Sequence, residues 1–72
     1  MEIMEIRWED GYEISVRIDG EMVIVSANRE GLQSLAMQLA DLAEEQPGAH
    51  IHLDRYNSLE DGSAELIIEL TA

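Results

Sequence analysis

The sequence predicts an α+β domain in which one helix packs on one face of a five-stranded, mainly antiparallel sheet, in the order β-β-β-α-β-β. Three observations support this fold class. Residues 28–46 repeat apolar side chains with a helical period, the segments on both sides alternate apolar and polar residues, and glycine-containing turns separate them. A chain of 72 residues has room for one core, so we expect residues 1–72 to form a single domain.

The predicted helix runs from Asn28 to Gln46. Asn28 is a good N-cap because its side-chain oxygen can accept from free amides of the first turn, and Pro47 ends the helix because it has no N–H to donate. A lone amphipathic helix must cover its apolar stripe, and here only a sheet is present to receive it. The residues of this stripe, spaced by three and four, are Leu32, Leu35, Ala36, Leu39, Leu42 and Ala43.

The first two predicted strands, residues 3–8 and 12–18, are separated by Glu9-Asp10-Gly11. A two-residue turn would mix apolar and polar residues on each face. A three-residue loop with Gly11 in the left-handed region places Trp8 opposite Tyr12 and keeps one face apolar, so we expect that loop.

A third strand follows the dipeptide Asp19-Gly20, which predicts a two-residue hairpin turn. This turn pairs Val16 with Val23 and adds Val23 and Val25 to the inner face. Met22 and Ile24 then fall on the outer face, which is therefore partly apolar.

Residues 49–55 and 64–70 alternate again and predict the last two strands, joined by a polar loop over residues 56–63. The sequence leaves open which of these two strands lies beside the first. The expected inner residues are Ile51, Leu53, Leu66, Ile68 and Leu70, and the outer residues of the earlier strand are His50, His52 and Asp54.

Charge is the strongest feature of the composition. Sixteen acidic residues face four basic ones, giving a net charge of −12. Nucleic acid and anionic membranes are repelled by such a chain, whereas a basic protein is attracted and steered toward it. The alternative is that the acidic residues only keep a small domain soluble. The chain has no cysteine and no long apolar run, and its first residues are acidic rather than basic, so we expect a cytoplasmic protein.

His50, His52 and Asp54 form the sharpest group of chemically active side chains. Residues two apart in a strand share a face, so two imidazoles and a carboxylate project together, and Glu65 and Glu69 join them if the last two strands pair. Such a set can hold zinc or another divalent ion, which makes a small metal-binding protein the alternative function. The simpler interpretation is two ordinary outer-face histidines paired with nearby acids.

Enzymatic function is not predicted. None of the five serines lies in a Gly-x-Ser-x-Gly elbow, and no carboxylate is singled out as a general acid, so neither catalytic residues nor a cofactor is expected. Tyr56 and Asn57 instead combine with Asp54, Glu60 and Asp61 into an aromatic and acidic patch of the kind found at interfaces. Tyr56 packed on the sheet end is the competing interpretation. The partly apolar outer face also allows a homodimer.

The chain resembles the bacterial Immunity protein 32 family. The similarity covers about residues 26–70, in the segments Ser26–Leu32, Pro47–Asp54, Tyr56–Ser63 and Glu65–Ile68. It implies a protein of polymorphic toxin systems that binds and neutralises a cognate bacterial toxin, and it carries over no catalytic residues. The best-matching positions are His50, His52, Asp54, Asn57, Leu59, Gly62, Ser63 and Glu65, of which Gly62 can serve a turn and Leu59 the core beneath the loop.

Together, charge and resemblance favour an inhibitor of a protein toxin, and a basic toxin such as a nuclease is one hypothesis for its target. The predicted contact surface is the open sheet face with the loop that follows it. Its partner-binding residues are His50, His52, Asp54, Tyr56, Asn57, Glu60, Asp61 and Glu65, and the alternative metal ligands are His50, His52 and Asp54.

Overall fold

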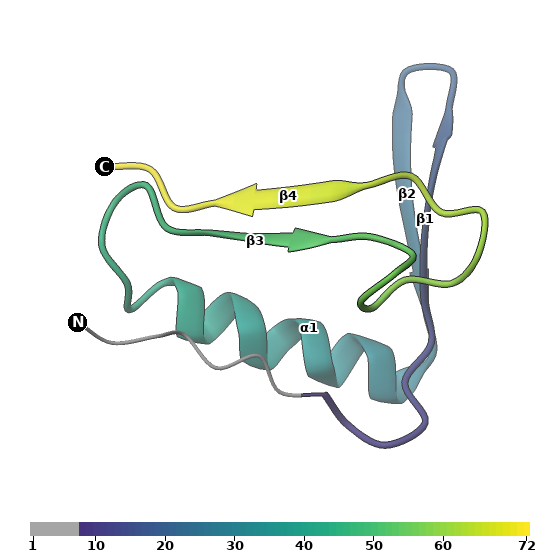
Figure 1. Ribbon diagram of the computed structural model, residues 1–72, viewed down its shortest axis with the longest axis horizontal. Helices are drawn as coiled ribbons and strands as arrows, with labels where there is room; N and C mark the ends of the chain where they lie inside the picture. The colour runs from purple at the N-terminus through teal and green to yellow at the C-terminus, as the bar shows by residue number, and fades with distance from the viewer. Residues whose placement is uncertain (1–7) are drawn as a thin grey trace.

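The computed structural model describes residues 8–72 and shows one helix and two antiparallel strand pairs in this part of the chain (Figure 1). The α+β class is confirmed, but the single five-stranded sheet is wrong. One pair joins the first strand to the second, and the other joins the third to the fourth. The elements are β1 (Ile14–Asp19), β2 (Met22–Ala27), α1 (Arg29–Leu42), β3 (His50–Leu53) and β4 (Leu66–Glu69).

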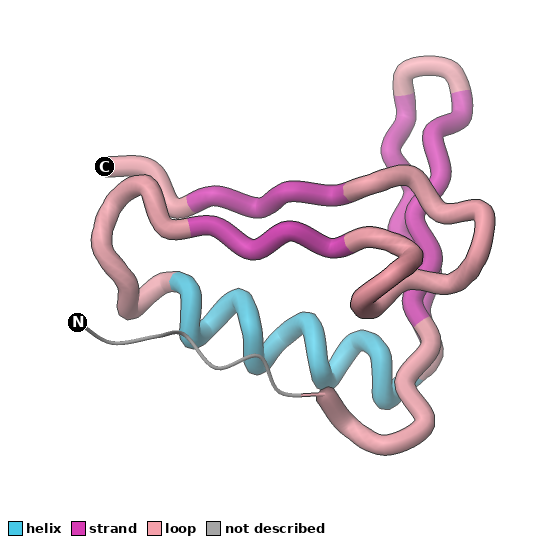
Figure 2. Tube along the Cα trace, viewed as in Figure 1, coloured by secondary structure: helices cyan, strands magenta, loops and turns pink. Residues whose placement is uncertain are grey.

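A loop occupies the strand edge at which a larger sheet would have formed. The carbonyl groups of Ile14 and Val16 accept hydrogen bonds from the N–H groups of Glu60 and Ala64, each at 2.8 Å. The free edge of β1 therefore binds the loop between β3 and β4, and the β1–β2 hairpin runs across the direction of β3–β4 (Figure 2). The predicted strand at residues 3–8 lies outside the described residues except for Trp8, which is not in a strand.

The turn between β1 and β2 is shifted from the predicted position. Asp19 pairs with Met22, so the two turn residues are Gly20 and Glu21 rather than Asp19 and Gly20. Gly20 has φ +62°, whereas Glu21, like every non-glycine residue of the described chain, has no positive φ. A type II′ turn requires this combination, with glycine at its first central position. The register moves by two residues, and because side chains alternate with a period of two, the predicted faces are kept.

The preceding loop follows the prediction only in part. Gly11 has φ +79°, as expected, but the N–H of Tyr12 donates to the carbonyl of Glu9 at 3.2 Å, so the chain reverses in a two-residue Asp10-Gly11 turn rather than in the expected three-residue loop. The rings of Trp8 and Tyr12 stack with centroids 4.6 Å apart and an angle of 19° between planes. This stack covers one end of the core.

Asn28 joins the start of α1 to the start of the hairpin. Its Oδ1 accepts from the N–H groups of Gly31 at 2.8 Å and Glu13 at 3.0 Å, and its Nδ2 donates to the carbonyl of Gly11 at 2.9 Å. Its own N–H donates to the carbonyl of Glu13 at 3.1 Å. The predicted N-cap is confirmed, and the same side chain also fixes where the chain enters β1.

The helix buries a different side from the predicted one, and it ends at Leu42 rather than Gln46. Leu42 is buried and Leu35 packs against the core, but Leu32 and Leu39 are 56% and 45% exposed, so this part of the predicted stripe is wrong. The buried side consists of Gly31, Ser34, Gln38 and Leu42.

Small and polar side chains suit this side because the helix approaches other backbone segments closely. A Cβ on Gly31 would lie 2.5 Å from the carbonyl oxygen of Glu13 and 2.9 Å from Cγ1 of Ile14. The buried Ser34 hydroxyl accepts from the N–H of Glu9 and donates to the carbonyl of Glu30, both at 2.8 Å. Hydrogen bonding therefore compensates the burial of its polar group.

The core lies where the base of the hairpin meets α1, β3 and the loop before β4. Its buried members are Ile14, Val16, Leu53 and Leu59, which confirms the predicted place of Leu59 beneath the loop. The far half of the hairpin leaves this core and projects beyond β4 (Figure 1). Two residues predicted to be inside, Ile18 and Val23, are consequently exposed, and Val25, which pairs with the buried Val16, is also 41% exposed.

Replacing Gly31 by alanine tests the close approach of helix and strand. Alanine favours an isolated helix by about 1 kcal/mol, but here its methyl group overpacks the contact, which costs about 1–3 kcal/mol. We expect Gly31→Ala to lower the free energy of unfolding in urea by up to about 2 kcal/mol. Gln33→Ala, at an exposed position of the same helix, is the control and should stay within about 0.5 kcal/mol of the wild type. A stabilised Gly31→Ala protein would contradict this packing.

Candidate functional site

The outer face of β3–β4 is open and carries both histidines. The register pairs His50 with Glu69 and His52 with Ile67, and all four side chains are exposed. Ile51 and Leu53 point the other way and are buried. The predicted division of this strand into an apolar and a polar face is therefore confirmed, and pairing with β4 adds the two predicted acids, Glu65 and Glu69, to the polar face.

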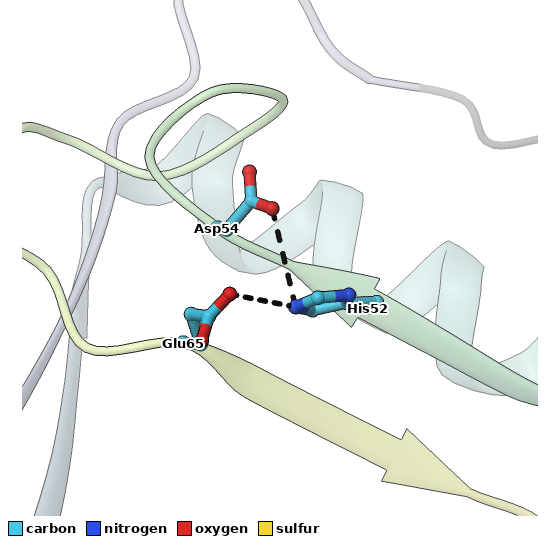
Figure 3. Close-up of side chains that lie close together, drawn as sticks. All are labelled: His52, Asp54 and Glu65. Carbon is cyan, nitrogen blue, oxygen red and sulfur yellow. Dashed lines mark hydrogen bonds and ion pairs between the residues drawn. The ribbon is translucent and has the colours of Figure 1, made fainter.

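His52, Asp54 and Glu65 converge at one end of this face (Figure 3). Nε2 of His52 lies 3.2 Å from Oε1 of Glu65 and 3.9 Å from Oδ2 of Asp54. Within residues 8–72, these three are the side chains whose ligand atoms lie close enough to hold one metal ion, all within 4.8 Å of one another. His50 shares the face but is not part of this triad.

The loop after β3 is built by two of the predicted contact residues. Oδ1 of Asp54 accepts from the N–H groups of Tyr56 at 2.9 Å and Asn57 at 3.1 Å. Oδ1 of Asn57 accepts from the N–H of Asp54 at 3.0 Å and from the hydroxyl of Ser58, and its Nδ2 donates to the carbonyl of His52 at 2.9 Å. Asp54 and Asn57 therefore shape the loop; Asn57 was expected from the sequence as a turn former, whereas this role of Asp54 was not predicted.

Tyr56 stands out from this loop into solvent. It is 82% exposed, so the interpretation that it packs on the sheet end is wrong. The guanidinium of Arg55 lies 4.9 Å from its ring centroid and donates to its hydroxyl at 2.6 Å. An open hollow of about 270 Å³ adjoins the ring, lined by Asp54, Arg55, Tyr56, Ser63 and Glu65.

Glu60 and Asp61 continue the charged surface along the loop, where both are exposed. The backbone of Glu60 is anchored to β1, and Gly62 follows with φ +85°, as its predicted turn role requires. The surface thus combines exposed carboxylates, two imidazoles and one aromatic ring. Such side chains serve recognition by another molecule or ligation of a cation.

A second exposed surface lies on the hairpin. Ile18, Met22, Val23 and Val25 are each more than 40% exposed. The sequence indicates this surface because β2 carries apolar residues on both faces. Each strand of the hairpin has six residues, and one helix can cover only the base of such a hairpin. Within the described part of the chain, no helix has the length and apolar character needed to cross a membrane.

Comparison with known proteins gives one match. A family model described as Immunity protein 32 matches residues 23–71, which include α1, β3, β4, all of β2 except Met22, and the charged surface formed by β3, β4 and the loop between them. No match is found among curated proteins or among solved structures.

Unfolding free energies of two variants test which residues hold the loop in its conformation and which are only exposed on it. Asn57→Ala removes three side-chain hydrogen bonds, with Asp54, His52 and Ser58, each worth about 0.5–1.5 kcal/mol, so we expect urea unfolding to show a loss of about 1.5–4.5 kcal/mol. Tyr56→Ala removes only an exposed contact with Arg55 and should cost less than about 1 kcal/mol. Equal losses in the two variants would show that Tyr56 also supports the fold.

Proposed function

The chain belongs to the Immunity protein 32 family, and from this premise we propose that it binds a cognate protein toxin and neutralises it by occupying the toxin's surface. The family match carries this proposal, because it covers most of the chain. The open surface supports binding as the mode of action, since its side chains are exposed and charged.

The proposed contact surface is the acidic face, which we define as the outer side of β3–β4 with the loop that follows β3. Tyr56 is its anchor: an aromatic ring with one apolar body and one polar tip is the side-chain type that most often dominates binding energy at interfaces. Arg55 holds the ring in place, which reduces the entropy lost when a partner covers it. The other residues of the acidic face are His50, His52, Asp54, Asn57, Glu60, Asp61, Glu65 and Glu69.

The chemistry of the acidic face favours a basic partner. Five carboxylates lie on this face, with Arg55 as the basic residue beside them, and the whole chain carries a net charge of −12. A basic protein gains association rate from such a field, and like-charged partners are excluded by it. A toxin that acts on nucleic acid, with a positive substrate site, has the complementary charge.

Substitution of the anchor tests the proposed surface. The probe is a candidate toxin domain, chosen from the genes that neighbour the one for this chain, and the readouts are growth rescue on co-expression and the dissociation constant from calorimetry. We expect Tyr56→Ala to weaken binding by about 30-fold or more, corresponding to a loss of about 2 kcal/mol.

The control for the anchor is Val23→Ala on the exposed hairpin, which should cost less than about 1 kcal/mol of binding. Greater weakening by Val23→Ala than by Tyr56→Ala would move the contact to the hairpin. Absence of both binding and rescue by the wild-type chain would refute the proposed function itself.

Salt dependence tests the electrostatic part of the proposal. We expect the association rate to fall steeply as ionic strength rises toward 1 M, because the Debye length shrinks to about 3 Å, while the dissociation rate changes less.

Two double variants, each removing two negative charges, then show which part of the surface accelerates association with the toxin. Glu60→Gln with Asp61→Asn should slow association at low salt more than Asp19→Asn with Glu21→Gln, which removes the same charge from the hairpin turn. A larger effect of the hairpin variant would show that the toxin approaches from that side.

A further inference from the structure

One imidazole nitrogen and two carboxylate oxygens meet at the end of β3, in the triad His52, Asp54 and Glu65 (Figure 3). Their distances already approach those of ligands around a single ion. Metal–ligand bonds of about 2.0–2.2 Å with tetrahedral angles place ligand atoms about 3.3–3.6 Å apart. Here Nε2 of His52 is 3.2 Å and 3.9 Å from the two carboxylate oxygens, and the largest separation in the triad is below 4.8 Å.

Two of the three ligands are held in position by the fold. Asp54 uses Oδ1 to accept two backbone N–H groups, so its Oδ2 remains turned toward His52. His52 lies in β3, and its carbonyl is fixed by Asn57. Glu65 precedes β4 and its side chain is 71% exposed. A rotamer change can therefore bring its carboxylate closer to that of Asp54 without moving the backbone.

We propose that His52, Asp54 and Glu65 bind a divalent transition-metal ion, with zinc as the expected ion and water completing its coordination. A nitrogen and two carboxylate oxygens suit zinc better than magnesium or calcium, which prefer oxygen ligands alone. The net charge of −12 adds long-range attraction for a cation. His50 is not a ligand, which distinguishes this site from the one predicted from strand alternation.

A metal ion at this point would clamp the loop that carries Tyr56. Asp54 lies at the start of that loop and Glu65 at its end, so the ion links the two ends directly. Because the ion binds the folded loop and not an unfolded chain, it must stabilise the fold by mass action. This site does not depend on toxin binding and is tested without a toxin.

Calorimetric titration of the full 72-residue protein with Zn²⁺ tests the site, and we expect a complex of one ion per chain. His52→Ala and Glu65→Gln should abolish it, because each removes a ligand. The matched controls are His50→Ala and Glu69→Gln, which change the same residue types on the same face and should retain the complex. Loss of the complex in the controls as well as in the ligand variants would overturn the proposal.

Two further readouts separate ligation from general attraction to an acidic surface. At 100 times its dissociation constant, Zn²⁺ should raise the folded-to-unfolded ratio about 100-fold and Tm by about 11–22 °C, and Mg²⁺ should not. In NMR spectra, the imidazole signals of His52 should shift on zinc addition while those of His50 stay in place. Equal Tm shifts with Mg²⁺, or no shift of the His52 signals, would show that the triad is only a histidine paired with two acids.

Discussion

The side chain of Asn28 is the constraint on which the rest of the structure depends. Its Oδ1 caps α1 and accepts from the N–H of Glu13, the residue immediately before β1. Its Nδ2 donates to the carbonyl of Gly11 in the preceding turn. A helix N-terminus, a strand and a loop therefore meet at one amide group. Because these hydrogen bonds bring the first turn of α1 against β1, the contact position must be a residue without a side chain, and Gly31 occupies it.

The loop after β3 extends the same kind of local control to the functional surface. Asp54 and Asn57 bond each other's backbone and fold the chain back on itself, and this turns Tyr56 outward. Further on, Glu60 and Ala64 donate to the edge of β1. One loop thus closes the core through Leu59, satisfies a strand edge that would otherwise be free, and presents an aromatic ring with acidic neighbours to a partner.

Several features could be predicted because they depend on neighbours in the sequence. Alternation placed His50 and His52 on one face, Asn28 was recognised as the N-cap, and Gly11 was expected in the left-handed region. The exposed acids of the loop and the family were also predicted. The hairpin register was wrong by two residues, because both Asp19-Gly20 and Gly20-Glu21 can form the turn, yet the faces were right since the error was even.

The sequence by itself determined the element types, the faces of the strands, the charge of the surface and the family, since each follows from local spacing, composition or motif. Only the tertiary structure decided that the strands form two pairs, that α1 buries Ser34 and Gln38 while Leu32 faces solvent, and that His52 rather than His50 meets Asp54 and Glu65. The physical reason is competition between distant groups. Segments tens of residues apart decide which strand edge a loop binds and which side of a helix can approach a strand. The spacing of apolar residues along the sequence contains no information about these contacts.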